Sequence, residues 1–309
     1  MHLDRRQFLE VLGTTAFTAV GATPAGASGG DSHEDPMGML VDTTNCIGCR
    51  KCEFACSQAH HLNDLPVEAF EDKAVFENHR RMDANALTVV NRFPNEEEPD
   101  KPTYVKSNCL HCLNPGCVSA CLVGALQKTE TGAVVYDPWK CIGCRYCMVA
   151  CPFEVPAYEF LEPLAPRVRK CDFCAERTAE GKIPACAEMC PPMCLTYGKR
   201  SELLQMAREK IEERPDRYVH RIYGEEEAGG TAWLYLAPKE FEQLGFIHLG
   251  SEGVPVLTET IQHSIFRYGV LPLMLFGLLG ATMRSLGPEV EPEPAISPIG
   301  QADEQTLSP

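Results

Sequence analysis

The chain has 309 residues, with 43 acidic and 28 basic side chains and a formal net charge of −15. Nucleic-acid binding needs a basic surface that neutralises phosphates, so this charge balance argues against it. Hydrophobic residues make up 44%, enough for packed cores, and the length allows roughly two domains. The 17 cysteines are an odd number, so internal disulfides cannot pair all of them.

The first part of the chain has the features of an export signal. The pair Arg5 and Arg6 precedes a stretch without charge from residue 11 to residue 30, and small residues at Ala25–Ala27 end it like a cleavage site. The arginine pair, followed by Phe-Leu, is similar to a twin-arginine signal, the class that exports proteins already folded with their cofactors. We predict a signal peptide over residues 1–30 and a periplasmic location, with an ordinary export signal or a soluble helix as alternatives.

All cysteines but one, Cys194, fall into four groups of four. The first and third groups share the spacing C-x2-C-x2-C-x3-C, the second is C-x2-C-x4-C-x3-C and the fourth is C-x2-C-x11-C-x3-C. Pro152 follows the third group, which reproduces the bacterial ferredoxin motif, whereas Ser57 follows the first. In chain order the groups are Cys46, Cys49, Cys52 and Cys56; Cys109, Cys112, Cys117 and Cys121; Cys141, Cys144, Cys147 and Cys151; and Cys171, Cys174, Cys186 and Cys190.

This spacing favours iron–sulfur clusters, because three thiolates on one tight loop can bind three irons of a cluster. The fourth cysteine lies about one helical turn further along and binds the other cluster in two-cluster ferredoxins. The four groups therefore predict four [4Fe–4S] clusters with the grouped cysteines as iron ligands. Structural zinc normally uses two separated cysteine pairs, and closely spaced cysteines make a poor disulfide framework. A zinc-binding interaction module is kept as an alternative from another functional class.

The segment Cys141–Phe153 and the set of four groups resemble the four-cluster ferredoxin-like subunits of membrane oxidoreductases. That family includes the electron-transfer subunits of dimethyl sulfoxide reductase, formate dehydrogenase and polysulfide reductase. The segments Gly38–Cys49, Tyr223–Thr231 and Ile261–His263, with a hydrophobic stretch near the C-terminus, are most similar to the hydrogenase-2-type subunit. The resemblance implies an α+β fold of two nested bacterial-ferredoxin-like modules with insertions.

The resemblance also implies a function and a set of partners. The chain would be a non-catalytic subunit that relays electrons between a periplasmic catalytic subunit and an integral membrane quinone-reactive subunit. A nickel–iron hydrogenase, with its small and large subunits, is the favoured catalytic partner. The alternative is the same relay in a molybdopterin oxidoreductase of the dimethyl sulfoxide reductase, formate dehydrogenase or polysulfide reductase type.

Ligand pairing across the groups is a further implication of the resemblance. It places one cluster on each of four sets, and the first and fourth groups form one module while the second and third form the other. A proline often follows the fourth cysteine in relatives, and Leu122 stands there after the second group, which removes no ligand. The implied sets are Cys46, Cys49, Cys52 with Cys190; Cys171, Cys174, Cys186 with Cys56; Cys109, Cys112, Cys117 with Cys151; and Cys141, Cys144, Cys147 with Cys121.

Domain boundaries follow from composition. Tyr268–Met283 carries no charge, and flanking residues extend it toward the roughly 20 residues that a membrane span needs. We expect a single-pass anchor with the C-terminus inside; a buried core helix is the alternative. The expected order after the signal is a four-cluster domain (38–200), a partner-facing α/β extension (201–260), a transmembrane anchor (261–286) and a disordered tail (287–309).

Several short elements are expected around the cysteine groups. Ser201 is expected to cap the one long helix, and the acidic run Glu96–Glu98 is expected to be a solvated loop, with a partner-facing surface as the alternative. The predicted elements are helical turns at Val118–Cys121 and Met148–Cys151, strands at Gly132–Tyr136 and Thr231–Leu236, and helices at Ser201–Arg214 and Pro238–Gly245.

Five residues outside the predicted ligand set have candidate roles. His111 either donates a hydrogen bond to a cluster sulfur or lies in a surface loop, and Lys140 and Arg145 either tune a cluster or are merely solvated. Cys194 is either a buried, unreactive thiol or an alternative ligand. His263 either lies near a quinone headgroup or is an interfacial histidine without a role.

Overall fold

The computed structural model describes residues 35–95, 98, 100–255, 259, 273–282 and 284–285. The chain divides into two units, residues 1–259 and residues 260–309. Several predictions lie outside the described residues, and they stay predictions: the signal peptide at 1–30, Glu96 and Glu97 of the acidic run, His263, and the tail at 287–309.

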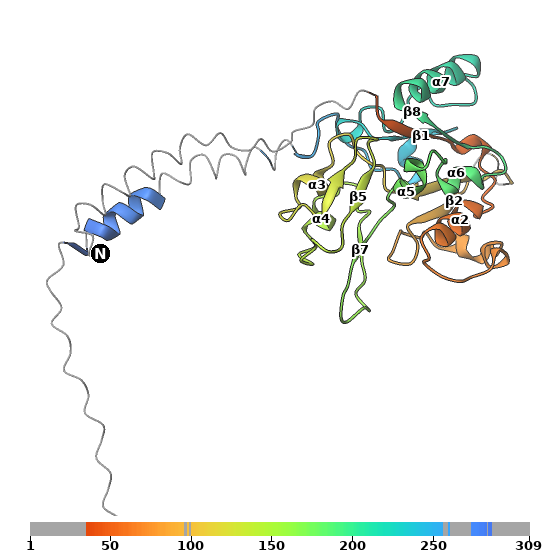
Figure 1. The fold of residues 1–309 in the computed structure, drawn as a ribbon. Helices are drawn as coiled ribbons and strands as arrows, with labels where there is room; N and C mark the ends of the chain where they lie inside the picture. The colour runs from red at the N-terminus through yellow and green to blue at the C-terminus, as the bar shows by residue number, and fades with distance from the viewer. Residues whose placement is uncertain are drawn as a thin grey trace, which may run out of the picture. The chain divides into compact units, whose positions relative to one another are not determined.

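A three-stranded sheet joins the two ends of the predicted four-cluster domain (Figure 1). Its central strand β1 (Met37–Asp42) pairs antiparallel with β8 (Leu195–Lys199) and parallel with β9 (Trp233–Leu236). The central strand and β9 are apolar runs that are almost wholly buried, as expected for strands covered on both faces. Since the first cysteine group follows β1 and the fourth group precedes β8, this pairing brings the two groups together.

Helix α7 (Arg200–Glu213) covers this sheet (Figure 1). Its buried residues are Leu203, Leu204, Ala207 and Ile211, whose spacing places them on one face of the helix. They form a core with Leu40 of β1 and with residues of β9. The extension after the last cysteine therefore completes the core of the domain that holds the first group.

Two pairs of short helices carry the cysteine groups. α2 (Lys51–Ala59) packs against α6 (Ala185–Glu188); α2 carries Cys52 and Cys56 of the first group, and α6 carries Cys186 of the fourth. α3 (Gly116–Ser119) packs against α4 (Tyr146–Val149), and these belong to the second and third groups. Figure 1 shows the second pair beside β5 and apart from the first pair. The nesting expected from the sequence is thus present in the helix packing.

The remaining elements form two-stranded sheets and single helical turns. The long segment between the first two cysteine groups contains the hairpin of β2 (Thr88–Phe93) and β3 (Thr103–Asn108). Two smaller hairpins join β4 (Leu126–Lys128) with β5 (Val134–Tyr136), and β6 (Ala157–Tyr158) with β7 (Val168–Arg169). Helix α5 is Ala175–Ala179, and the 3-10 turns are η1 (Thr43–Asn45), η2 (Val67–Phe70), η3 (Ala74–Glu77), η4 (Glu227–Gly229) and η5 (Phe241–Leu244).

The predicted helical turns exist, but they begin two residues early. Predicted at Val118–Cys121 and Met148–Cys151, they lie at α3 and α4, so Cys121 and Cys151 follow the helices instead of ending them. The strand predicted at Gly132–Tyr136 is confirmed in its last three residues as β5. The strand predicted at Thr231–Leu236 is confirmed as β9, while Thr231 itself forms only an isolated bridge with Cys112.

The helix predicted at Ser201–Arg214 is confirmed as α7, but the predicted cap at Ser201 is wrong. Ser201 lies inside the first turn, and it donates its N–H and hydroxyl to the carboxylate of Asp35 at 2.8 and 2.6 Å. A carboxylate from outside the helix therefore does the capping. The helix predicted to start at Pro238 begins only at η5; Gly245, in the left-handed region at φ +74°, ends it as expected.

The predicted membrane anchor is only partly covered. Residues 273–282, 284 and 285 are helical, and the other residues of the predicted segment 261–286 lie outside the described residues. None of the helices in the described parts of the chain combines the length and apolar character that crossing a membrane requires. The anchor is therefore not supported by the structure and stays a prediction.

Candidate functional site

The grouped cysteines gather at four places, which we number I to IV. Sites II to IV each combine three thiols of one group with a single thiol of another, near enough to influence one another electrostatically. Site I combines two thiols of the first group with one of the fourth, and Cys49 lies between those two thiols in the chain. Site I holds Cys46, Cys52 and Cys190; site II holds Cys56, Cys171, Cys174 and Cys186; site III holds Cys109, Cys112, Cys117 and Cys151; and site IV holds Cys121, Cys141, Cys144 and Cys147.

The four sites follow one another in a row. Cys52 of site I interacts with Cys186 of site II. Cys171 of site II interacts with Cys109 of site III, and the two share a small apolar core. Another core holds Cys117 of site III together with Cys147 of site IV. Sites I and II lie in one module and sites III and IV in the other, so the row crosses from module to module at its middle.

Burial favours the neutral form of these thiols as long as no metal is bound. It raises the pKa of Cys56, Cys112 and Cys171, and it raises the pKa of Cys147 to about 11. Buried thiolates need a cation nearby, since an isolated buried charge is expensive. Iron supplies that positive charge, and thiolate is the form in which cysteine binds it. Of the whole set only Cys144, at site IV, is exposed.

The loops of the first and third groups have the same backbone conformation. Both read C-I-G-C-R, with the glycines Gly48 and Gly143 at φ +64° and +71° and the arginines Arg50 and Arg145 at φ +61° and +59°. The left-handed residues turn the chain sharply, so successive cysteines face the same space. In Gly48 a Cβ would meet the ring of Tyr104 at 2.4 Å, which explains the glycine on steric grounds as well.

Backbone N–H groups also point at cysteine sulfur. Ala125 donates to Cys121 Sγ at 3.1 Å, and Gly143 and Phe173 donate to the sulfurs of Cys141 and Cys171, each at 3.4 Å. Such hydrogen bonds stabilise thiolate sulfur, and in iron–sulfur proteins they are among the factors that set the reduction potential. Sites II and IV thus have donors already oriented toward ligand atoms.

His111 is 1% exposed, so the predicted alternative that it lies in a surface loop is wrong. Its Nδ1 accepts a hydrogen bond from the Val134 N–H at 2.9 Å, and burial followed by the charge of Lys170 holds its pKa well below the usual value. The neutral ring therefore carries its proton on Nε2. That nitrogen has no hydrogen-bond partner within the described part of the chain. A buried donor beside Cys109 and Cys112 that has no protein acceptor fits a cluster sulfur as its acceptor.

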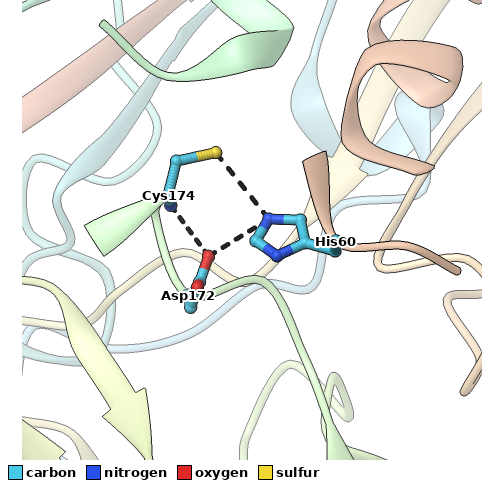
Figure 2. Close-up of side chains that lie close together, drawn as sticks. All are labelled: His60, Asp172 and Cys174. Carbon is cyan, nitrogen blue, oxygen red and sulfur yellow. Dashed lines mark hydrogen bonds and ion pairs between the residues drawn. The ribbon is translucent and has the colours of Figure 1, made fainter. Parts of the chain in front are cut away.

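A histidine and an aspartate lie beside one thiol of site II (Figure 2). His60 Nε2 is 3.3 Å from Asp172 Oδ1 and 3.7 Å from Cys174 Sγ, and the same carboxylate accepts the Cys174 N–H at 2.8 Å. The three groups are close enough to hold a metal ion. Since Cys174 also belongs to site II, we assign this triad to the surroundings of that site and not to a separate metal site.

Cys194 lies at site I. It is 4% exposed, and its sulfur is 3.3 Å from that of Cys190. Hydrogen bonding from Cys194 lowers the pKa of Cys46 and lowers that of Cys190 to about 6. The prediction that the Cys194 thiol is buried is confirmed. Its position next to two grouped cysteines is also compatible with the predicted alternative, a ligand to the cluster at site I.

The other candidates have partners of their own. Lys140 forms an exposed ion pair with Asp137 at 3.2 Å, and Arg145 lies over the rings of Tyr158 and Phe160 at 5.5 and 5.7 Å. Sequence reasoning did not identify Lys106, which is 3% exposed. It lies on β3 and is followed by two polar residues, and a lysine in such a stretch is usually exposed to solvent.

Comparison with known proteins identifies the motifs. Two models described as "4Fe-4S dicluster domain" match residues 45–125 and 101–200. A relative from Nitratidesulfovibrio vulgaris, named only as a protein, is 44% identical over 91% of this chain and 78% of its own length. The hydrogenase-2 operon protein HybA of Escherichia coli O157:H7 is 30% identical over 91% of this chain and 95% of its own length. The formate dehydrogenase-O iron-sulfur subunit of Escherichia coli K12 is 34% identical over 70% and 71%.

The comparisons and the thiol sites agree on the cofactor. Two dicluster domains and four sites of closely spaced thiols correspond to four [4Fe–4S] clusters, which the chain binds. The domains are ferredoxin-like, as expected, and the zinc alternative finds no support in the comparisons.

Proposed function

The chain belongs to the multi-cluster ferredoxin-like electron-transfer subunits of oxidoreductase complexes, and we propose that it passes electrons along sites I to IV between two partner subunits. The row of four sites is the observation that carries this proposal. A protein that merely used clusters to stabilise its fold would not need them in an unbroken sequence. A linear order with neighbouring thiols at each junction is what stepwise electron transfer requires.

We assign the cysteines of each site as the ligands of one cluster, with Cys49 completing site I. Each site then takes three ligands from one group and one from another, as in two-cluster ferredoxins. The clusters supply one-electron redox chemistry when bound. The protein holds them in place, excludes water around sites II and III, and orients N–H donors toward the sulfur atoms.

The end of the row at site IV reaches the surface. Site IV has the exposed thiol Cys144, and around it Trp139, Ile142 and Val149 are 96%, 64% and 81% exposed. Apolar side chains gathered on a surface are typical of contacts with another protein. Such a surface beside a terminal cluster supports the exchange of electrons with a partner subunit at this end of the row.

We propose a nickel–iron hydrogenase as the catalytic partner, with a membrane quinone-reactive subunit at the other end. The support is the nearly full-length similarity to HybA, which covers 91% of this chain, against 70% for the formate dehydrogenase-O iron-sulfur subunit. The identity of 34% to the formate dehydrogenase subunit keeps a molybdopterin oxidoreductase as the second candidate.

We further propose export through the signal at residues 1–30 and anchoring by residues 261–286 on the periplasmic side of the membrane. The support lies in the sequence: an arginine pair before an uncharged stretch, and the uncharged segment Tyr268–Met283. Truncation after residue 259 tests the anchor, because the shortened protein should move from the membrane fraction to the soluble periplasmic fraction. Retention of the truncated protein in the membrane, in cells lacking its partners, would refute the anchor.

The partner assignment is tested by anaerobic purification of the tagged protein from its own membranes in mild detergent. Mass spectrometry of the copurifying chains should find the small and large subunits of a nickel–iron hydrogenase. A molybdopterin subunit in their place would retain the relay and change the substrate. A protein that contains zinc and no iron would contradict the relay altogether.

A further inference from the structure

Lys106 is a buried cation whose hydrogen-bond partners are neutral. Its Nζ donates to Thr88 Oγ1 at 2.7 Å and to Asn108 Oδ1 at 2.8 Å, and the residue is 3% exposed. Within the residues that the structure describes, no carboxylate lies within ion-pair distance of this ammonium group. A buried, unpaired ammonium is strongly unfavourable. Its charge must therefore be balanced by another negative group.

The negative groups that act most strongly on Lys106 are cysteine thiolates. Burial alone would lower its pKa, but neighbouring thiolates outweigh burial and raise the pKa above the usual lysine value. One of these thiolates belongs to site I and the others to site II. In decreasing order of influence they are Cys186, Cys52, Cys171 and Cys56.

The packing of the chain fixes the position of the charge. The ammonium lies 4.5 Å from the ring centroid of Trp233, a fully buried residue in the same core as Cys46, Cys52 and Cys186. The Lys106 carbonyl accepts a hydrogen bond from the Tyr235 hydroxyl at 3.1 Å, which ties β3 to β9. Charges act strongly over short distances where water is excluded. Lys106 is thus a fixed positive charge held between two cluster sites.

We propose that Lys106 sets the reduction potentials of the clusters at sites I and II. Each cluster accepts one electron on reduction, so its negative charge increases by one. Lys106 stabilises the reduced form more than the oxidised form and raises both potentials. This inference rests on the proposed function, because it assumes clusters at these two sites.

The test replaces Lys106 by methionine, which keeps the length of the side chain and removes the charge. The loaded protein is titrated anaerobically, and the four midpoint potentials are read by electron paramagnetic resonance. We expect the reduction equilibrium of two clusters to move at least tenfold toward the oxidised form, which is about 59 mV for one electron. The other two potentials should move less. Should Lys106→Met not fold, Lys106→Gln, which remains polar toward Thr88 and Asn108, carries the same expectation.

Two control variants separate a local charge from other effects. Lys106→Arg retains the charge and should leave the potentials near those of the parent protein. Lys101→Met removes a lysine whose side chain is 75% exposed in a surface pair with Glu98, and it should shift none of the potentials. Unchanged potentials in Lys106→Met, or equal shifts of all four clusters, would overturn the inference. A parent protein that binds no iron and sulfide would instead refute the proposed function.

Discussion

The hydrogen bond predicted from His111 to a cluster sulfur can be isolated by two substitutions. His111→Asn keeps an oxygen near the position of Nδ1, which can still accept the Val134 N–H, but it removes the Nε2 donor. His111→Gln places an amide N–H near the position of Nε2. The pair therefore differs chiefly in the donor, while both variants lose the ring that stacks on Phe173 at 4.9 Å.

The size of the effect follows from the burial of Nε2. A hydrogen bond to a charged group is worth about 1.5–3 kcal/mol, and a buried donor left unpaired costs about 1–3 kcal/mol. We take about 1 kcal/mol of the hydrogen-bond energy as favouring the reduced cluster over the oxidised one. A tenfold change in the reduction equilibrium corresponds to ~59 mV for one electron, so the potential of the cluster at site III should fall by about 40 mV in His111→Asn. The potential in His111→Gln should stay close to that of the parent.

The assay is an anaerobic redox titration followed by electron paramagnetic resonance, with iron and sulfide measured in each variant. Unchanged potentials in His111→Asn would refute the reasoning. Equal decreases in both variants would assign the effect to the lost stacking on Phe173 and would also refute a donor role.

Two further predictions concern ligation and stability. In Cys190→Ala the neighbouring thiol of Cys194 should replace the lost ligand, so the iron content should stay near that of the parent protein. The double variant Cys190→Ala/Cys194→Ala should lose the cluster at site I. Equal iron loss in the single and double variants would exclude the replacement. Burial raises the pKa of Asp42, but hydrogen bonds from Thr44 and Lys210 outweigh burial and hold this pKa below the usual value. The Asp42 carboxylate therefore stabilises the fold above about pH 4, and it loses this effect as the pH falls through its folded pKa. Asp42→Asn should therefore destabilise the protein at pH 7 by about 2 kcal/mol, visible as a lower Tm in circular dichroism; an unchanged Tm would contradict this.

The cofactor could be predicted from the sequence because cysteine spacing is local and specific, whereas the nesting of the modules was implied by the resemblance to the four-cluster subunits. A C-x2-C-x2-C loop has few conformations that bring its thiols together, and the similar glycine and arginine φ angles in the first and third groups agree with this. Short apolar strands such as β9 were predictable for a similar reason, since their composition alone indicates burial.

The surroundings of the sites could not be predicted, because they come from distant parts of the chain. Lys106 resembles a solvent-facing strand residue until β3 is placed against Trp233. Asp172 and His60 are far apart in sequence and meet only beside site II. The predicted cap of α7 was wrong for the same reason: we expected the Ser201 side chain to cap the helix, whereas the carboxylate of Asp35, which precedes β1, accepts the hydrogen bond from the Ser201 N–H.

In the proposed function, four clusters in a row carry electrons through this protein. Anaerobic purification with iron and sulfide analysis, followed by a stoichiometric reductive titration, tests it most directly. We predict four clusters of four irons per chain, with equal sulfide, and the uptake of four electrons in one-electron steps. Fewer than four redox-active clusters, or a protein that binds zinc and accepts no electrons, would contradict the account.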